Sequence, residues 1–298
     1  MIATSQTLEV RRAATPGNGG DLPRTRDVLG WELRRRVSSR RSWVLLACVA
    51  LFFAVYLVLT APLGITPTGQ PIPDPETSPH GMLHEVVVVV LPLFGMLLPF
   101  LAADGVARDA RQRVHELLMA TRVSSRAYVS GRYLAVLLLG LVLSVELLVV
   151  IWAVDVMLHA TRSGYPAPQF GPLVTIWVLT VLPAMVLLLS LSFALGTLWP
   201  RLSNLLKLAV LLGWIGLYVV GAEQILGHLP GWAQRLDPTS YLLYAAGQSR
   251  AVPGATPDPT RLPALQPWVL PHVGLVVLGV ALAVAAVAGF RRFRDVLA

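Results

Sequence analysis

Residues Leu173–Trp199 read LVTIWVLTVLPAMVLLLSLSFALGTLW, an apolar stretch without a charged side chain. A helix of about 20 such residues crosses the hydrocarbon core of a bilayer. Five further stretches of the chain have the same character, and the composition, 55% hydrophobic and only 13% charged, agrees with them. We therefore expect an all-α membrane protein with six transmembrane helices. The expected spans are Trp43–Leu63, Val86–Ala103, Tyr133–Leu158, Leu173–Trp199, Leu205–Ile225 and Val273–Phe290.

Basic side chains are concentrated on one side of these spans. Most of the 24 Lys and Arg residues precede the first span, follow the last, or lie in the second-to-third and fourth-to-fifth loops. The opposite side has Arg162, Arg235, Arg250 and Arg261. Because positively charged loops remain in the cytoplasm, both termini are expected inside the cell. The net charge of +8 thus reflects topology and gives no reason to invoke nucleic acid. The preference for arginine over lysine suggests a GC-rich bacterial genome, and hence a multi-pass protein of the bacterial cytoplasmic membrane.

The chain divides into a tail and a membrane domain. Residues 1–27, with Pro16-Gly-Asn-Gly-Gly20, are expected to form a disordered cytoplasmic tail, and residues 28–298 form the six-span domain. The long arginine-rich stretch before the first span is unlike a signal peptide, whose charged region is short. Cys48 is the only cysteine and lies within a span, so it has no intrachain disulfide partner.

Several catalytic motifs are absent from the sequence. Lys207 is the only lysine, and the residues around it do not form the Gly-x4-Gly-Lys-[Ser/Thr] loop that binds nucleotide phosphates. We also find no Gly-x-Ser-x-Gly elbow and no His-Glu-x-x-His zinc motif. The chain is therefore not expected to hydrolyse ATP itself.

One outer segment leaves a metal site open as an alternative. His80 and His84 are four residues apart, with Asp74 and Glu76 nearby. We favour a solvated loop that leads into the start of an interfacial helix.

An amphipathic helix is predicted just before the first span. Leu29, Leu33 and Val37 recur at helical spacing, and Trp31 and the neighbouring arginines suit the lipid headgroup level. The pattern favours a helix that lies along the inner leaflet over a plain basic stop sequence.

The cytoplasmic loop between the second and third spans is expected to contain a second short helix. Val114, Leu117 and Leu118 form a small apolar face with charged flanks, a form suited to docking in a groove of another protein. Ser124 or Ser125 is expected to cap the helix that enters the third span. If only the charge of the loop is considered, the alternative is a solvated loop that docks on no partner.

This loop resembles the coupling segment of ABC-2 type transporter permeases, the membrane subunits of ATP-driven exporters. The resemblance rests on Glu116-Leu117-Leu118, the turn Ala120-Thr-Arg-Val-Ser-Ser-Arg126, and Gly131-Arg132 at the opening of the third span. Arg122 stands where the family usually has proline, and Arg132 replaces its lysine. By this resemblance the ATPase-coupling residues are Arg108, Arg111, Arg113, Glu116, Leu117, Leu118, Arg122 and Arg126.

The resemblance covers roughly residues 28–292. It includes the fourth-to-fifth turn, Leu195–Ser203, and an outer segment, Leu229–Tyr241, that in the family forms short helices in the outer leaflet. It implies two permease subunits, identical or related, that enclose the substrate path. It also implies two cytosolic P-loop ATPase subunits that bind the ATP and Mg²⁺, so that this chain binds no cofactor of its own.

Glu146 is the most unusual residue of the third span. It follows Arg132 by 14 positions, which places it about 21 Å into the bilayer at 1.5 Å per residue. A carboxylate at that depth lines a translocation path or a subunit interface, or else is protonated or hydrogen-bonded to a neighbouring helix. Asp155, His159 and Glu223 are expected nearer the outer surface, where solvent makes them ordinary.

Two other classes of function remain alternatives to a transporter subunit. An intramembrane enzyme would need a convergent acid/base or metal constellation, and the sequence shows none. A non-transporting scaffold or sensor would use the central loop to dock a signalling protein.

Overall fold

The computed structural model describes residues 25–61, 76–102, 124–249 and 262–297, and these residues form helices and no strands. The long helices are α1 (Thr25–Val37), α2 (Arg40–Thr60), α4 (Leu91–Ala102), α7 (Ser125–Thr161), α8 (Phe170–Leu198), α9 (Ser203–Gly216) and α12 (Gln266–Leu297). Shorter elements are α3 (Pro79–His84), the π-helices η1 (Glu85–Val90) and η3 (Leu217–Ile225), the 3₁₀ turns η2 (Pro200–Leu202) and η4 (Leu226–His228), α10 (Gly231–Gln234) and α11 (Tyr241–Ser249).

The six predicted spans are confirmed. Six helical segments are long and apolar enough to cross a membrane: Ser42–Thr60, Pro79–Ala102, Ser125–Thr161, Phe170–Leu198, Pro200–Gly221 and Gln266–Phe290. The second and third are longer than predicted, because helical backbone continues through polar residues that a hydropathy pattern excludes. The second span thus begins at Pro79, so the histidines His80 and His84 lie in a helix rather than in a loop.

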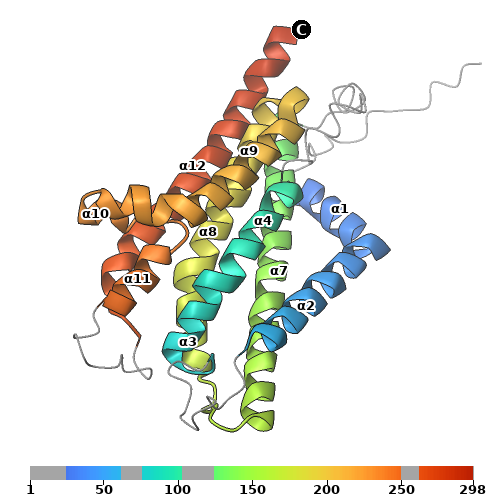
Figure 1. Ribbon diagram of the computed structural model, residues 1–298. Helices are drawn as coiled ribbons and strands as arrows, with labels where there is room; N and C mark the ends of the chain where they lie inside the picture. The colour runs from blue at the N-terminus through green and yellow to red at the C-terminus, as the bar shows by residue number, and fades with distance from the viewer. Residues whose placement is uncertain (1–24, 62–75, 103–123, 250–261, 298) are drawn as a thin grey trace, which may run out of the picture.

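Helix α8 is the centre of the bundle. It packs against α12, α4, α7 and α9, and Figure 1 shows it between α12 on one side and α4 and α7 on the other. Two thirds (67%) of its most apolar window is buried within the chain, against 22% for α9 and α12 and 17% for α2. A helix that is apolar on every side belongs in such a position, since no polar face has to reach water.

Polar side chains connect the spans inside the bundle. The Tyr133 hydroxyl on α7 shares a hydrogen bond of 2.7 Å with Ser190 Oγ on α8. Trp177 Nε1 on α8 donates to Ser144 Oγ on α7 at 2.8 Å. Such hydrogen bonds orient membrane helices that the hydrophobic effect alone does not hold together. These two hydrogen bonds fix α7 against α8 at two positions along their length.

Two glycines allow close helix crossings. A Cβ on Gly279 of α12 would lie 3.1 Å from the Val186 carbonyl oxygen of α8. A Cβ on Gly131 of α7 would lie 2.7 Å from Val28 Cβ and 2.9 Å from the Thr25 carbonyl oxygen, both on α1. A small residue lets two backbones approach this closely. A Cβ on Gly213 or Gly216 of α9 would meet nothing within 4 Å in this chain.

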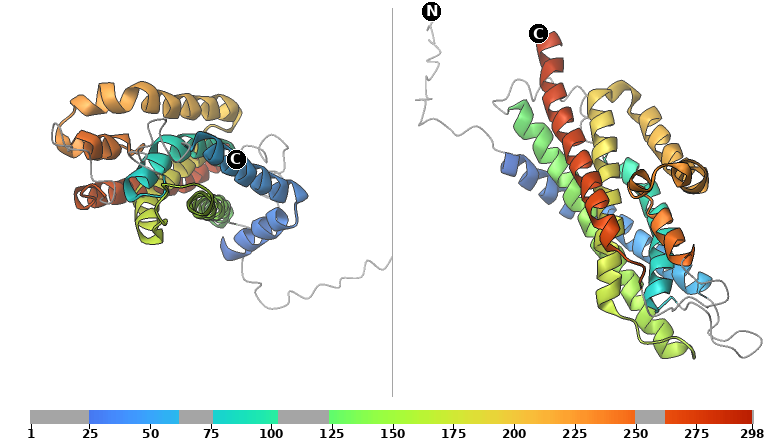
Figure 2. Two further views of the ribbon diagram at one scale, coloured as in Figure 1. Left: turned by 60° about the horizontal axis from the view of Figure 1, so that its bottom comes forward. Right: turned by 90° about the vertical axis from the view of Figure 1, so that its left-hand side faces the viewer.

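Helices α1 and α2 are separated by a sharp bend and pack against α7, on the side of the bundle away from α10 and α11 (Figure 2). The break falls at Ser39, whose backbone is extended. Ser38 Oγ donates to the Arg35 carbonyl oxygen at 3.1 Å, and Trp43 Nε1 donates to the Val37 carbonyl oxygen at 2.8 Å. Because these hydrogen bonds satisfy the last carbonyls of α1, the helix can end here and turn away from α2.

The Gly131→Ala substitution is expected to separate α1 from α7. The added methyl group would overlap Val28 and the α1 backbone, so we expect a loss of about 1–3 kcal/mol in the free energy of unfolding. Thermal unfolding in detergent measures the effect. The matched control is Gly171→Ala in the first turn of α8, which meets no neighbour and should leave the melting temperature unchanged or slightly raised. Equal behaviour of the two variants would contradict the close crossing.

Candidate functional site

The predicted coupling residues lie mostly outside the described part of the chain. Arg108, Arg111, Arg113, Glu116, Leu117, Leu118 and Arg122 all fall within residues 103–123, which the structure does not describe. Description resumes at Ser124, whose Oγ accepts a hydrogen bond of 3.1 Å from the Ala127 backbone N–H and caps α7, as predicted. Arg126 follows in the first turn and is exposed. The loop therefore leads directly into a well-capped helix.

The helix predicted before the first span is α1, and its described side chains are distributed unevenly. Leu29 and Leu33 are half-buried, whereas Trp31 and Val37 are 56% and 62% exposed. The side chain that α1 buries most is Glu32, at 4% exposure. Sequence reasoning did not single out this carboxylate.

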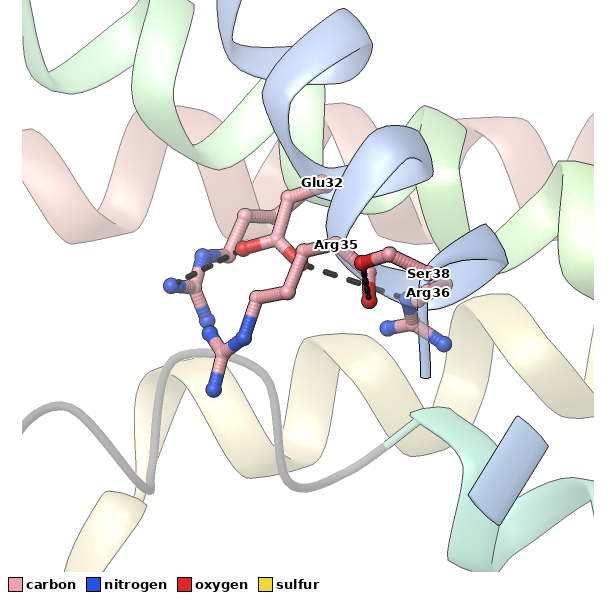
Figure 3. Close-up of polar contacts among 5 residues, drawn as sticks. Glu32, Arg35, Arg36 and Ser38 are labelled. Carbon is pink, nitrogen blue, oxygen red and sulfur yellow. Dashed lines mark hydrogen bonds and ion pairs between the residues drawn. The ribbon is translucent and has the colours of Figure 1, made fainter. Parts of the chain in front are cut away.

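Glu32 forms an ion pair with an arginine of another helix. Its Oε1 lies 3.1 Å from Arg132 Nη2 on α7, and its Oε2 lies 3.9 Å from Arg36 Nε one turn later on α1. Arg132 is itself 7% exposed, and its guanidinium also lies 5.0 Å from the centre of the Tyr128 ring. Figure 3 shows the Glu32 carboxylate beside Arg35 and Arg36. The pair is thus a buried contact between two segments a hundred residues apart in sequence.

Electrostatics at this junction are dominated by burial. Burial lowers the pKa of Arg36 below its usual value, Glu32 opposes this shift, and Arg132 and Arg35 reinforce it. Removing one partner of a buried ion pair leaves the other charge uncompensated and costs several kcal/mol. The contact between α1 and α7 therefore depends on both Glu32 and Arg132.

Gly131 and Arg132 have complementary roles in this contact. The glycine lets α1 approach the α7 backbone, and the next residue supplies the charge that neutralises Glu32. The sequence signal for this site was the dipeptide Gly131-Arg132 at the opening of the third span. Its partner on α1 could not be identified without the crossing geometry.

A second polar cluster lies at the opposite end of α7. Arg162 donates from Nη1 to the Ala61 carbonyl oxygen at 2.9 Å and from Nη2 to the Val58 carbonyl oxygen at 3.2 Å, which caps the end of α2. A cation at a helix C-terminus is favoured by the helix dipole. The loop after α7 is held as well, because His159 Nδ1 lies 2.8 Å from the Tyr165 carbonyl oxygen.

Three carboxyl groups lie close enough to repel one another when charged: Glu76 (which also interacts with Arg162), Glu85 on η1 and Asp155 on α7. Burial raises the pKa of Glu76, against the influence of Tyr165 and Arg162. Burial, and then Glu76, raises the pKa of Tyr165 to about 12. The prediction that Asp155 is an ordinary solvated residue is wrong: its side chain is fully buried, and it lies close enough to Glu85 of η1 and to Glu76 for their charges to interact. His159 is exposed, as predicted.

The outer histidines do not lie in a solvated loop. His80 is 3% exposed, and the rings of His80 and His84 lie 6.0 Å and 5.3 Å from the ring of Tyr244 on α11. Within the described ranges, no three His, Cys, Asp or Glu side chains come together in a way that could hold a metal ion. These histidines pack the start of the second span against α11.

The outer segment between the fifth and sixth spans is organised around Asp237. Its Oδ1 accepts hydrogen bonds from the Thr239 backbone N–H at 2.9 Å and the Thr239 hydroxyl at 2.6 Å, and its Oδ2 accepts one from the Leu242 backbone N–H at 3.0 Å. Ser240 follows with a positive φ of 58°. Burial raises the pKa of Asp237 even though these donors oppose the shift. The carboxylate therefore fixes the turn from which α11 begins.

Glu146 lies close to the middle of α7. It is half-buried, and its Oε2 has no hydrogen-bond partner among the described residues. Its neighbour Val145 is 50% exposed on the outside of the chain.

Taken together, six long apolar helices with buried polar contacts at both ends of α7 define a multi-pass α-helical membrane protein. The sequence profile described as ABC-2 family transporter protein matches residues 60–287, about three quarters of the chain. The chain therefore belongs to the ABC-2 transporter family and is a membrane permease of an ABC transporter. No curated protein matches it closely. Helix α1 and most of α2 precede the matched range, so the α1–α7 junction is known from the structure alone.

The Glu32→Gln substitution is expected to destabilise the protein by about 3–5 kcal/mol, because it leaves Arg132 buried without its counter-charge. The lowered melting temperature in detergent measures this. Asp27→Asn is the matched control: Asp27 lies on the same helix and pairs with Arg26 at 3.8 Å, but both side chains are exposed, and such pairs contribute little. In the charge-exchanged variant Glu32→Arg/Arg132→Glu, part of the stability should return. Equal effects of Glu32→Gln and Asp27→Asn would contradict the buried pair.

Proposed function

We propose that this permease is the transmembrane subunit of an ATP-driven exporter, with separate cytosolic ATPase subunits that dock on residues 103–123. The family membership supports the role of a membrane subunit. The observation that carries the coupling proposal is the continuity between this loop and α7, which starts at the Ser124 cap.

The mechanism follows from the contacts of α7. Closure of the ATPase subunits would displace the loop and, with it, the first turn of α7. Because the Glu32–Arg132 ion pair joins α1 to α7, α1 would move together with α7. The Tyr133–Ser190 and Trp177–Ser144 hydrogen bonds would pass the same movement to α8. At the far end, Arg162 holds the end of α2. Because α7 is a rigid helix held at both ends, displacement of its cytoplasmic end can open the bundle at its outer end, which is a hinge-type change.

The permease is proposed to work as a dimer, with an identical or a related second subunit. Helix α9 offers an apolar face with Leu205, Leu208 and Leu212 at 61%, 47% and 57% exposure, and Gly213 and Gly216 lie beside it without a neighbour in this chain. Either lipid or the second subunit covers this face in the membrane. The substrate would pass between the two bundles.

Replacing Glu116, Leu117 and Leu118 with Ser is expected to abolish most of the ATPase binding, because these residues supply the docking face. The test is purification of the full-length chain from native membranes in nanodiscs, followed by mass spectrometry and a vanadate-sensitive ATPase assay. The control is Arg201→Ala/Leu202→Ser, two exposed residues in the fourth-to-fifth turn, which is proposed to lie on the same side.

Retention of a stoichiometric P-loop subunit by the control and its loss from the triple variant would support coupling through the central loop. Equal ATPase retention by the triple variant and the control would overturn it. Absence of any ATPase from the unaltered chain, under conditions that preserve other membrane complexes, would favour a scaffold or an enzyme instead.

Glu146 is proposed to face the translocation path. Because Cys48 is the only cysteine, Cys48→Ala gives a cysteine-free background in which Glu146→Cys can be tested. A water-lined position should react with a membrane-impermeant methanethiosulfonate reagent in the assembled complex, since that reagent modifies hydrated thiols. Val145→Cys, on the exposed outer face of α7, should remain unmodified. Failure of Glu146→Cys to react in either the ATP-free or the vanadate-trapped complex would contradict this role.

A further inference from the structure

The second span has an irregular backbone where Pro92 enters it. Residues Glu85–Val90 form the π-helix η1, and the Leu91 backbone N–H donates to the Val86 carbonyl oxygen, five residues earlier. In this register the next carbonyl along the chain, that of Val87, would accept a hydrogen bond from the backbone of residue 92. Proline has no N–H to donate. In the described second span, the Val87 carbonyl oxygen is therefore left without a backbone donor in this register.

A tyrosine of the fifth span supplies that donor. The Tyr218 hydroxyl, on η3, donates to the Val87 carbonyl oxygen at 2.6 Å. Four residues earlier, on α9, Trp214 Nε1 donates to the Pro92 carbonyl oxygen at 3.1 Å. The Trp214 indole fills the space beside Gly95, where an added Cβ would overlap it. Two side chains of the fifth span, one helical turn apart, thus bind the backbone of the second span around its proline.

The Tyr218 hydroxyl also contacts the outer segment. It lies 2.9 Å from the Thr239 carbonyl oxygen, in the turn that Asp237 fixes before α11. Helix α11 in turn packs against both η1 and η3. Because a hydroxyl has a single proton, Tyr218 can donate a full-strength hydrogen bond to only one of the two carbonyls at a time. The shorter contact, to Val87, is the favoured one here, and Thr239 offers the alternative acceptor.

Burial makes these hydrogen bonds important. Val87 and Thr239 are both fully buried, so water does not readily replace the tyrosine hydroxyl as donor. A buried carbonyl that loses its hydrogen bond bears the cost of its desolvation, and inside a membrane every backbone polar group needs a partner from the protein. The state of the Tyr218 hydroxyl therefore bears directly on how the second span and the outer segment are held.

We propose that Tyr218 is a positioning residue for transport, whose hydroxyl takes the place of the missing Pro92 N–H and joins the second span, the fifth span and the outer segment. When the outer end of the bundle opens, the hydroxyl can turn from the Val87 carbonyl to that of Thr239. The second span is then released while the outer segment stays attached to the fifth span. This step in the cycle rests on the proposed exporter function, whereas the replacement of the proline N–H does not.

The test is a double-mutant cycle on the full-length chain in nanodiscs, without any ATPase subunit. Tyr218→Phe removes the hydroxyl and keeps the ring, and it should lower the melting temperature by about 3–6 °C. Pro92→Ala restores a backbone N–H that can donate to the Val87 carbonyl. In the Pro92→Ala background, Tyr218→Phe should therefore lower the melting temperature by less than half as much. The same loss in both backgrounds would overturn the replacement of the proline N–H.

The matched control is Tyr133→Phe, which removes a different hydroxyl, the one bonded to Ser190 Oγ. Its effect on the melting temperature should be the same with Pro92 and with Pro92→Ala. A second measurement, hydrogen–deuterium exchange followed by mass spectrometry, uses the single variants alone. Amides of α11 should exchange about tenfold faster in Tyr218→Phe and at the unaltered rate in Tyr133→Phe.

Unchanged exchange of α11 in Tyr218→Phe would overturn the attachment of the outer segment through this hydroxyl. Both measurements are made on the permease alone, so they are distinct from the search for an ATPase partner. Failure to find that partner would contradict the exporter function and leave the expected melting temperatures and exchange rates as they are.

Discussion

A charged side chain that is removed from water needs an opposite charge beside it, and in this protein that requirement joins α1 to α7. The Glu32 carboxylate and the Arg132 guanidinium are both almost completely removed from solvent, and their oxygen and nitrogen lie 3.1 Å apart. Neither charge is tolerable there without the other. The approach that brings them together is possible because Gly131 has no side chain to keep α1 at a distance.

Helix α7 connects this junction to the rest of the bundle. It is held by Arg132 near its start, by hydrogen bonds to α8 in the middle, and by Arg162 and the Tyr165 loop at its end. Its 37 residues extend over about 56 Å at 1.5 Å per residue, more than the thickness of a hydrocarbon core. Both ends of the helix therefore lie where a partner or solvent can act on them. In an ABC-2 permease, this geometry suits an element that carries a cytosolic displacement to the outer side.

The sequence predicted the fold better than the site. Runs such as Leu173–Trp199 identify spans because lipid tolerates few alternatives, and Ser124 identifies the start of α7 because capping is local. Glu32 was missed because its partner, Arg132, lies a hundred residues away in the sequence and comes close only where α1 crosses α7. Asp155 was misjudged because hydropathy gives depth in the membrane but does not show whether other parts of the chain bury the side chain.

Helices α1 and α7 are proposed to move as one body when ATP drives the transporter. The most direct measurement is a pulsed electron paramagnetic resonance distance between spin labels at Gly30→Cys on α1 and Arg126→Cys on α7, in the Cys48→Ala background. Gly30 has no neighbour within 4 Å and Arg126 is exposed, so both positions can carry a label. We expect the same α1–α7 distance in the ATP-free and vanadate-trapped complexes, whereas the distance between the label on α7 and a label at Leu202→Cys should change. A shift of the α1–α7 distance between the two states would contradict it.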